Sequence, residues 1–295
     1  MASKPTKTAA KPAPKPAAAK PAPAPVTKQQ EKAKSLPAVK ANPDIAALES
    51  EVFGGGDRSG FENVTSADIT IPRITILQKL SPQLDKKKPE FVEGAEVGMF
   101  CDTSTGDVFT ELKIIPVFYA LVYLEWAPRN TGKGLVQNHG MDKSVLDRAQ
   151  QDEKRKWWLP NGNYVAETAT YFCLNVSGGN SRCFIPLASS GLKASRDWMA
   201  ALSRMKGTRA DGSTFDVPLM YRSWVAHSVE RSNNEGDWYT WRFDPAETIL
   251  ELDPTRELLA EAKLFYEAAS SGLVRANMAG MSDEDSGDGD NAGTM

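Results

Sequence analysis

One helical segment interrupts a middle region that otherwise consists of strand-like runs. Residues 181–187 read Ser-Arg-Cys-Phe-Ile-Pro-Leu, a short apolar run typical of a strand. Ser189 and Ser190 follow, and serine is a favoured N-cap residue. Apolar and small residues then recur at helical spacing, at Leu192, Ser195, Met199 and Leu202. The sequence therefore predicts a strand that leads into a helix over 189–205.

The longest apolar run of the chain, 112–126, is too rich in Ile, Val, Tyr and Phe for a helix. It also contains Pro116, so we predict a long strand that is bent or bulged near the proline. Alternation places one set of residues on a core face, namely Leu112, Ile114, Phe118, Val122 and Leu124. The other face would carry Lys113, Tyr119, Tyr123 and Glu125.

The order of the predicted elements indicates a fold class. The strand-like runs are 112–126, 164–176, 182–187, 217–229 and 237–243. Residues 207–213, which follow the predicted helix, are predicted to be a loop. Five strands with one helix between the third and fourth is the order of the OB-fold barrel, which binds oligonucleotides and oligosaccharides. We predict a mainly β chain built on a five-stranded OB-like barrel. Extra strands are expected at 69–77 and 97–109, and an amphipathic C-terminal helix at 254–270.

The two ends of the chain differ from the middle in composition and in charge. Residues 1–42 are mostly Ala, Lys and Pro, with nine lysines and one acid, Glu31, which predicts a disordered basic tail. Residues 43–275 form the single predicted domain. Residues 276–295 are predicted to be a disordered acidic tail, whose carboxylates are Asp283, Glu284, Asp285, Asp288 and Asp290.

Several classes of protein are disfavoured by what the sequence lacks. No stretch has the ~18 consecutive apolar residues of a membrane helix, and no secretory signal is evident, so we expect a cytoplasmic protein without a membrane partner. The three cysteines have no metal-site spacing, and a disulfide framework is not expected. Cys173 and Cys183 lie inside apolar runs and are expected to be small core residues. The two histidines are far apart, and no nucleotide-binding or nucleophile motif is present. We predict no catalytic residues, metal or cofactor, and therefore no enzyme.

What the sequence does contain is aromatic residues interleaved with cations. Such a pattern suits single-stranded nucleic acid, because bases stack on aromatic rings while cations follow the backbone. Trp157 and Trp158 follow three cations in a polar loop, which makes them the most distinctive pair. The alternative is that each aromatic residue packs in the core. The predicted contact residues are Lys113, Tyr119, Tyr123, Arg129, Lys133, Lys154, Arg155, Lys156, Trp157, Trp158, Arg222, Trp224, Trp238 and Arg242.

The strand order and the acidic tail together resemble the replication single-stranded DNA-binding proteins of bacteria and tailed phages. Three stretches also resemble an uncharacterised family of phage early proteins: Ile71–Ile74, Ile115–Val117 with Leu124–Trp126, and Ser190–Lys193 with Trp198. The resemblance implies non-specific single-stranded DNA binding during phage replication or recombination, in the host cytoplasm. It also implies that the acidic tail recruits a phage polymerase, helicase or recombinase.

Two other functions remain open from the sequence. One is a structural or assembly protein of the virion, whose basic tail contacts packaged DNA while the folded part only packs. The other is a barrel that binds carbohydrate or peptide.

Overall fold

The computed structural model describes residues 71–128, 131, 133–234, 236–278 and 281. The chain divides into two compact units, 1–55 and 56–295, and every described residue belongs to the second. The predicted basic tail, Arg129 and the five tail carboxylates therefore lie outside the described residues.

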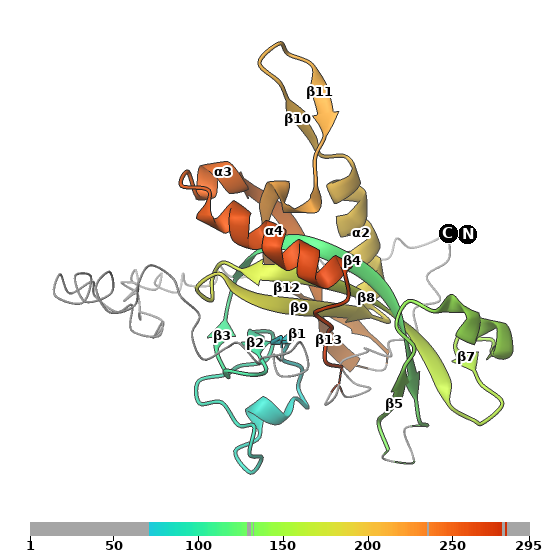
Figure 1. The fold of residues 1–295 in the computed structure, drawn as a ribbon. Helices are drawn as coiled ribbons and strands as arrows, with labels where there is room; N and C mark the ends of the chain where they lie inside the picture. Colours follow the sequence, from blue (N-terminus) through green and yellow to red (C-terminus); the bar gives the residue numbers. More distant parts are fainter. Residues whose placement is uncertain (1–70, 129–130, 132, 235, 279–280, 282–295) are drawn as a thin grey trace, which may run out of the picture. The chain divides into compact units, whose positions relative to one another are not determined.

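Five long strands form the main antiparallel sheet, in which β13, β12, β4, β8 and β9 are neighbours in that order (Figure 1). Their bounds are β4 (Leu112–Trp126), β8 (Tyr164–Asn175), β9 (Ser181–Ala188), β12 (Arg222–Asn233) and β13 (Gly236–Thr248). The prediction of a mainly β chain is confirmed. The predicted helix after the third of these strands is also present, as α2 (Gly191–Ser203).

Smaller elements extend the main sheet or lie beside it. Between β4 and β8 lies an excursion that we call the arm, residues 127–163, which contains β5 (Leu135–Asn138), η3 (Lys143–Arg148), β6 (Gln150–Gln151) and β7 (Trp157–Trp158). The N-terminal elements are β1 (Ile74–Ile76), η1 (Pro82–Leu84), β2 (Phe100–Asp102) and β3 (Val108–Phe109). The remaining elements are β10 (Lys206–Thr208), β11 (Thr214–Asp216), η4 (Leu219–Tyr221), α3 (Ile249–Leu252) and α4 (Glu257–Ser270).

None of the sheets formed by the described residues closes into a barrel, because β9 and β13 do not pair with each other. Helix α2 packs against both of these strands and spans the gap between them. The segment around β1 also bridges the gap. The Phe184 amide of β9 donates to the Pro72 carbonyl at 2.9 Å. The Gln78 side chain makes two hydrogen bonds of 2.9 Å with the backbone of Tyr239 in β13.

A bulge in β4 changes which residues face which side. The register with β8 shifts between Pro116 and Phe118, as the proline predicts. The predicted single core face is wrong, because a one-residue shift sends the side chains beyond it to the opposite face. Ile114 and Leu124, predicted to lie on one face, belong to different hydrophobic clusters.

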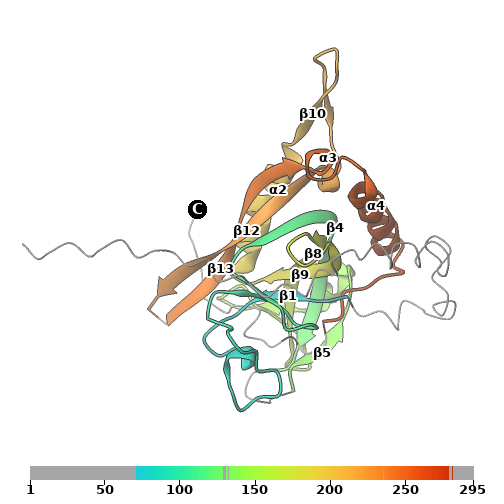
Figure 2. The same ribbon diagram turned by 90° about the vertical axis from the view of Figure 1, so that its left-hand side faces the viewer.

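Both faces of the β4–β8–β9 sheet are buried, and each is covered by a different helix (Figure 2). On one face α2 contributes Trp198, which stacks on Phe243 at 3.8 Å between ring centroids. On the other face α4 contributes Phe265, whose ring lies 6.1 Å from that of Phe172. We call these the α2-side core and the α4-side core.

Two boundaries differ from the prediction for local reasons. The loop predicted over 207–213 begins two residues later, because Gly207 and Thr208 belong to β10. It forms the tip of the β10–β11 hairpin, which projects from the main sheet (Figure 1). Gly207 lets this hairpin form, because a Cβ there would lie 2.4 Å from the ring of Phe215 on the paired strand. The strand predicted over 217–229 begins later, at Arg222, because Pro218 precedes a short 3₁₀ turn.

Two methionines that follow α4 in the chain pack against the sheet. Met278 and Met281 are only 3% and 5% exposed, and both belong to the α4-side core. Residues 272–278 contain no helix or strand.

Candidate nucleic-acid interface

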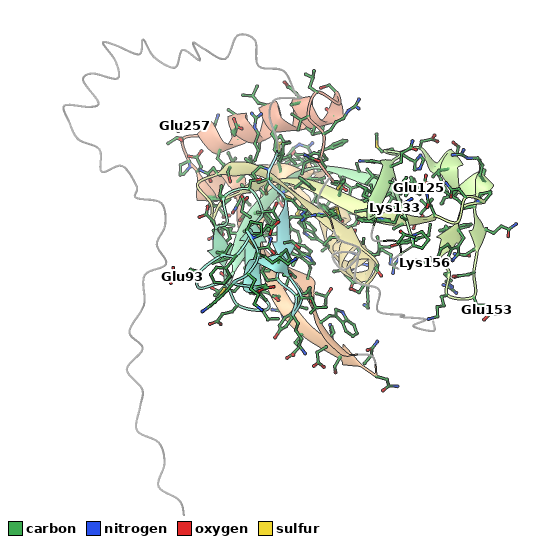
Figure 3. All side chains as sticks on the ribbon, turned by 90° about the horizontal axis from the view of Figure 1, so that it is seen from below. Glu93, Glu125, Lys133, Glu153, Lys156 and Glu257 are labelled. Atoms are coloured by element: carbon green, nitrogen blue, oxygen red, sulfur yellow. The ribbon has the colours of Figure 1, made fainter. Side chains whose placement is uncertain are left out.

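The arm holds the largest group of predicted contact residues. Figure 3 labels two cations of the arm, Lys133 and Lys156, and the arm residue Glu153. It also labels Glu125, which lies on β4, the strand that precedes the arm. Lys133, Lys154 and Arg155 are exposed, and Lys156 is half-buried. The arm therefore presents three cations to solvent.

Trp157 and Trp158 lie on opposite faces of β7, and both are half-buried. Trp157 packs against a small cluster around Tyr123, and Trp158 packs against the α4-side core. The Trp158 Nε1 donates to a carboxylate oxygen of Asp152 at 2.7 Å, which fixes the plane of the indole. The Trp157–Trp158 pair is therefore partly structural, and truncating either residue would also reduce stability.

A cation is held against the aromatic end of the α4-side core. The Lys156 Nζ lies 3.9 Å from the ring centroid of Tyr164 and 5.6 Å from that of Trp158. The two rings are 5.6 Å apart. Tyr164 is only 3% exposed, so the half-buried Trp158 is the ring of this pair that a base can reach. This end of the arm therefore combines a cation for phosphate contact with one accessible stacking surface.

Glu125 anchors the base of the arm through a buried polar network. It is 5% exposed, and its carboxylate accepts hydrogen bonds from Asn163 (2.6 Å), Asn161 (3.0 Å) and His139 Nε2 (2.9 Å). Burial acts to raise the pKa of Glu125, but the hydrogen bonds from Asn163, Asn161 and His139 outweigh it, so the pKa is lowered. The network joins β4 to the residue after β5 and to the C-terminal end of the arm. The sequence did not predict it, because its members are far apart in the chain and match no motif.

We expect Glu125→Gln to lower the free energy of unfolding at neutral pH by about 1.5–3 kcal/mol, because a charged acceptor is lost and the new amide opposes a donor. Since the folded pKa is lowered, the contribution of Glu125 is present above the unfolded value, about 4.3, and is lost as pH falls toward the folded pKa. The difference in free energy of unfolding between wild type and Glu125→Gln should therefore become smaller at acidic pH. Urea unfolding between pH 7 and pH 3 measures this. Glu153→Gln, at an exposed site, is the control, and an equal acid response of both variants would contradict the assignment.

The β12–β13 hairpin carries a second group of cations and aromatic residues. Residues that lie opposite each other in an antiparallel pair share a face. On one face Trp241 and Phe243 pack into the α2-side core. On the other face Arg231 lies opposite Trp238, and His227 lies opposite Arg242. The sequence analysis also places Trp238 and Arg242 on one face of this strand and Tyr239, Trp241 and Phe243 on the other, which agrees with these registers.

Arg231 is a candidate contact residue that the sequence analysis missed. It is exposed and lies directly opposite the half-buried Trp238. The hairpin turn could have identified this pair: with Asn233 opposite Gly236, the residue two positions before Asn233 lies opposite the residue two positions after Gly236. Arg242 is also exposed, and it donates to Asp244 at 3.0 Å, a carboxylate that lies 3.2 Å from His227 Nε2.

The predicted residues of β4 and early β12 are mostly engaged inside the protein. Tyr123 and Trp224 are 4% and 2% exposed, so their rings fill the core and no base can stack on them in this structure. Lys113 forms an ion pair of 3.1 Å with Glu247. Tyr119 and Arg222 are half-buried. The structure therefore concentrates the accessible candidates in the arm and the β12–β13 hairpin.

The described residues offer little for other kinds of site. Among them, no group of three or more His, Cys, Asp or Glu side chains is arranged to hold a metal ion. The three cysteines are free, and Cys173 and Cys183 are buried as expected. Cys101 is buried as well, and this burial raises its pKa to about 11. Within the same residues, no helix has the length and apolar character needed to cross a bilayer.

Comparison with known proteins relates the chain to phages. The family model described as Pam3 phage gp34-like protein matches residues 41–275, which include the arm and the whole main sheet. No curated protein and no solved structure matches the chain. The family match covers most of the sequence and confirms the expected phage relationship. The chain belongs to the Pam3 phage gp34-like protein family.

Proposed function

We propose that this phage protein binds single-stranded DNA without strong sequence preference during replication or recombination. The observation that carries the proposal is the placement of the accessible aromatic–cation groups on two projecting elements. One is the arm, between the first and second strands of the five-strand order, and the other is the β12–β13 hairpin, which joins the fourth and fifth. In OB folds, the connections at these two places flank the face that binds oligonucleotides.

The chemistry of both elements supports this function. The half-buried Trp158 lies beside Lys156 in the arm, and Trp238 lies opposite Arg231 in the hairpin. An aromatic ring offers a sequence-tolerant stacking surface, and a neighbouring cation neutralises phosphate. Two such groups on separate elements suit an extended strand that passes from one to the other.

The sheet supports an OB-like interpretation of the fold. Strand β4 pairs with both β8 and β12, β8 pairs with β9, and the helix α2 follows the third strand. We interpret the arrangement as an OB-like barrel that is open between β9 and β13, with α2 and the β1 segment in the opening. An open barrel can bind an extended ligand just as a closed barrel can, because the ligand contacts outer surfaces and loops.

Titration of the full chain with fluorescent oligo-dT, and with a duplex of equal length, tests the proposal. We expect tighter binding of the single strand, because stacking requires unpaired bases, and a steep loss of affinity with salt, because phosphate contacts release counterions. A variant with glutamine at the nine lysines of residues 1–42 separates the contribution of the basic tail. Equal affinity for duplex in this variant would contradict the proposal.

The alternative function is a structural or assembly protein of the virion, whose basic tail contacts packaged DNA. It predicts a different result in the same titration. Neutralising the nine tail lysines would then abolish binding to single strands and duplex alike, because the folded part would make no contact. We further propose that the acidic residues beyond 282 recruit a phage replication or recombination enzyme, and that the protein itself catalyses no reaction.

A further inference from the structure

The β12–β13 hairpin leaves the main sheet as a two-stranded ribbon. In the described sheet β12 pairs with β4 from Trp224 to Ala226, and its residues beyond Ala226 pair with β13 alone. A two-stranded ribbon has little stability of its own in water. The orientation of the Trp238–Arg231 pair therefore depends on what supports the ribbon from the rest of the protein.

Three successive residues on one face of β13 are each held by a different part of the chain. Phe243 stacks on Trp198 of α2 at 3.8 Å between ring centroids, and Trp241 packs on Phe100 of β2 at 4.9 Å. Tyr239, the next residue on this face, contacts the segment that joins β1 to β2. Of the three supports, this one adjoins the proposed stacking residue in the chain.

Gln78 binds Tyr239 in the way that a neighbouring strand would. Its Nε2 donates to the Tyr239 carbonyl, and its Oε1 accepts from the Tyr239 N–H, both at 2.9 Å. Because β13 is an edge strand of the main sheet, these two backbone groups would otherwise lack a partner strand. The N–H belongs to the planar peptide group that joins Trp238 to Tyr239, so Gln78 also restricts the backbone of Trp238.

The position of Gln78 is itself fixed by a closed loop, residues 78–98. The Gly98 N–H donates to the Leu77 carbonyl at 2.7 Å, and the Leu77 N–H donates to the Met99 carbonyl at 2.8 Å. Leu77 is fully buried, so the loop is anchored where it closes. Gly98 has a φ of +86°, and a Cβ there would lie 2.8 Å from the ring of Tyr239. Both ends of the loop therefore meet at Tyr239.

Lys79 holds the residue on the other side of Trp238. Its Nζ lies 2.9 Å from a carboxylate oxygen of Asp237, and both side chains are exposed. The hydrogen bond with Asp237 raises the pKa of Lys79, and the nearby charges of Asp237 and Glu230 act in the same direction. Lys79 therefore neutralises a carboxylate that would repel phosphate beside the stacking surface.

We propose that Gln78 is a positioning residue for the binding of single-stranded nucleic acid, because it fixes the backbone beside Trp238 and so keeps the indole oriented for stacking. Lys79 supports the same surface by neutralising Asp237. This role rests on the proposed function. Gln78 itself contacts no nucleic acid, and its effect on affinity passes through Trp238.

Replacement of Gln78 by methionine keeps the length of the side chain and removes its amide group. We expect Gln78→Met to weaken oligo-dT binding several-fold in the full chain, with an unchanged slope of log affinity against log salt, because no phosphate contact is lost. In a Trp238→Ala background the same substitution should not change affinity further, because the residue that Gln78 positions is absent. Gln83→Met is the matched control and should leave affinity unchanged, since Gln83 is a half-buried glutamine on η1 in the same loop.

Amide hydrogen exchange measures the Gln78–Tyr239 hydrogen bond directly. The Tyr239 amide should exchange slowly in the wild type and much faster in Gln78→Met, while the melting temperature changes little. A general loss of structure would instead lower the melting temperature. It would also weaken oligo-dT binding to the same extent with tryptophan or alanine at position 238.

A paired substitution tests Lys79. Lys79→Gln should weaken oligo-dT binding several-fold, and Lys79→Gln with Asp237→Asn should restore it, because the double variant has the wild-type net charge at this site. If the double variant binds as weakly as Lys79→Gln, Lys79 does not act by neutralising Asp237, and this part of the proposal is wrong.

Two results would overturn the role of Gln78 without affecting the proposed function. One is equal binding of oligo-dT by the wild type and Gln78→Met. The other is an equal loss of affinity from Gln78→Met with tryptophan or alanine at position 238. If the wild type binds no single strand, the proposed function fails, and the role of Gln78 fails with it.

Discussion

Truncation of Trp198 to alanine is expected to lower the free energy of unfolding by about 3–5 kcal/mol, because it removes a large buried ring and leaves a cavity. Trp198 is 2% exposed and holds α2 against the sheet. Its ring centroid lies 3.8 Å from that of Phe243 and 4.3 Å from that of Tyr171. It therefore connects β13 and β8, which pair with each other nowhere in the described sheet.

Denaturant unfolding of wild type and variant measures this loss, and Leu264→Ala provides the control. Leu264 is 57% exposed on α4, so its truncation should change the free energy of unfolding by less than about 0.5 kcal/mol. Trp198→Phe keeps an aromatic ring at the same position and should recover part of the loss, which gives a measurable value even where the alanine variant fails to fold. A loss below about 1 kcal/mol for Trp198→Ala would show that α2 is not essential to the main sheet.

Replacement of Trp238 by alanine is expected to weaken oligo-dT binding by about 1–3 kcal/mol, or roughly 5- to 150-fold, because one stacking surface is lost. Arg231→Gln, on the opposite residue of the hairpin, should lower the slope of log affinity against log salt by about 0.7 for the one phosphate contact removed. The two variants therefore separate stacking from charge on one pair of residues.

Fluorescence titrations over a range of salt concentrations measure both effects. Trp238→Phe is the conservative variant and should retain most of the affinity, whereas Arg209→Gln is the control for a general loss of charge. Arg209 is also exposed, but it lies on the β10–β11 hairpin, where its guanidinium is 4.8 Å from the ring of Phe215. If Arg209→Gln lost as much affinity as Arg231→Gln, the loss would be caused by the change in net charge. Arg231 would then not be an interface residue.

The elements of this fold were largely readable from the sequence, because they depend on local periodicity. The run 112–126 is the strand β4, and the residues after Ser190 are the helix α2. Burial of Cys173 and Cys183 followed from their apolar neighbours. Alternation along β13 separated Trp238 from Trp241, because consecutive positions of a strand point to opposite faces.

Only the tertiary structure decided what each of these side chains meets. Tyr119 and Tyr123 have the same parity on β4, yet Tyr119 is half-buried and Tyr123 is core, because the arm folds back over one end of the strand. Likewise, Glu125 is an ordinary acid in the sequence, and its three donors are one residue after β5 and two residues at the C-terminal end of the arm. A local pattern specifies period and propensity, whereas burial and hydrogen-bond partners depend on segments that are distant in the chain.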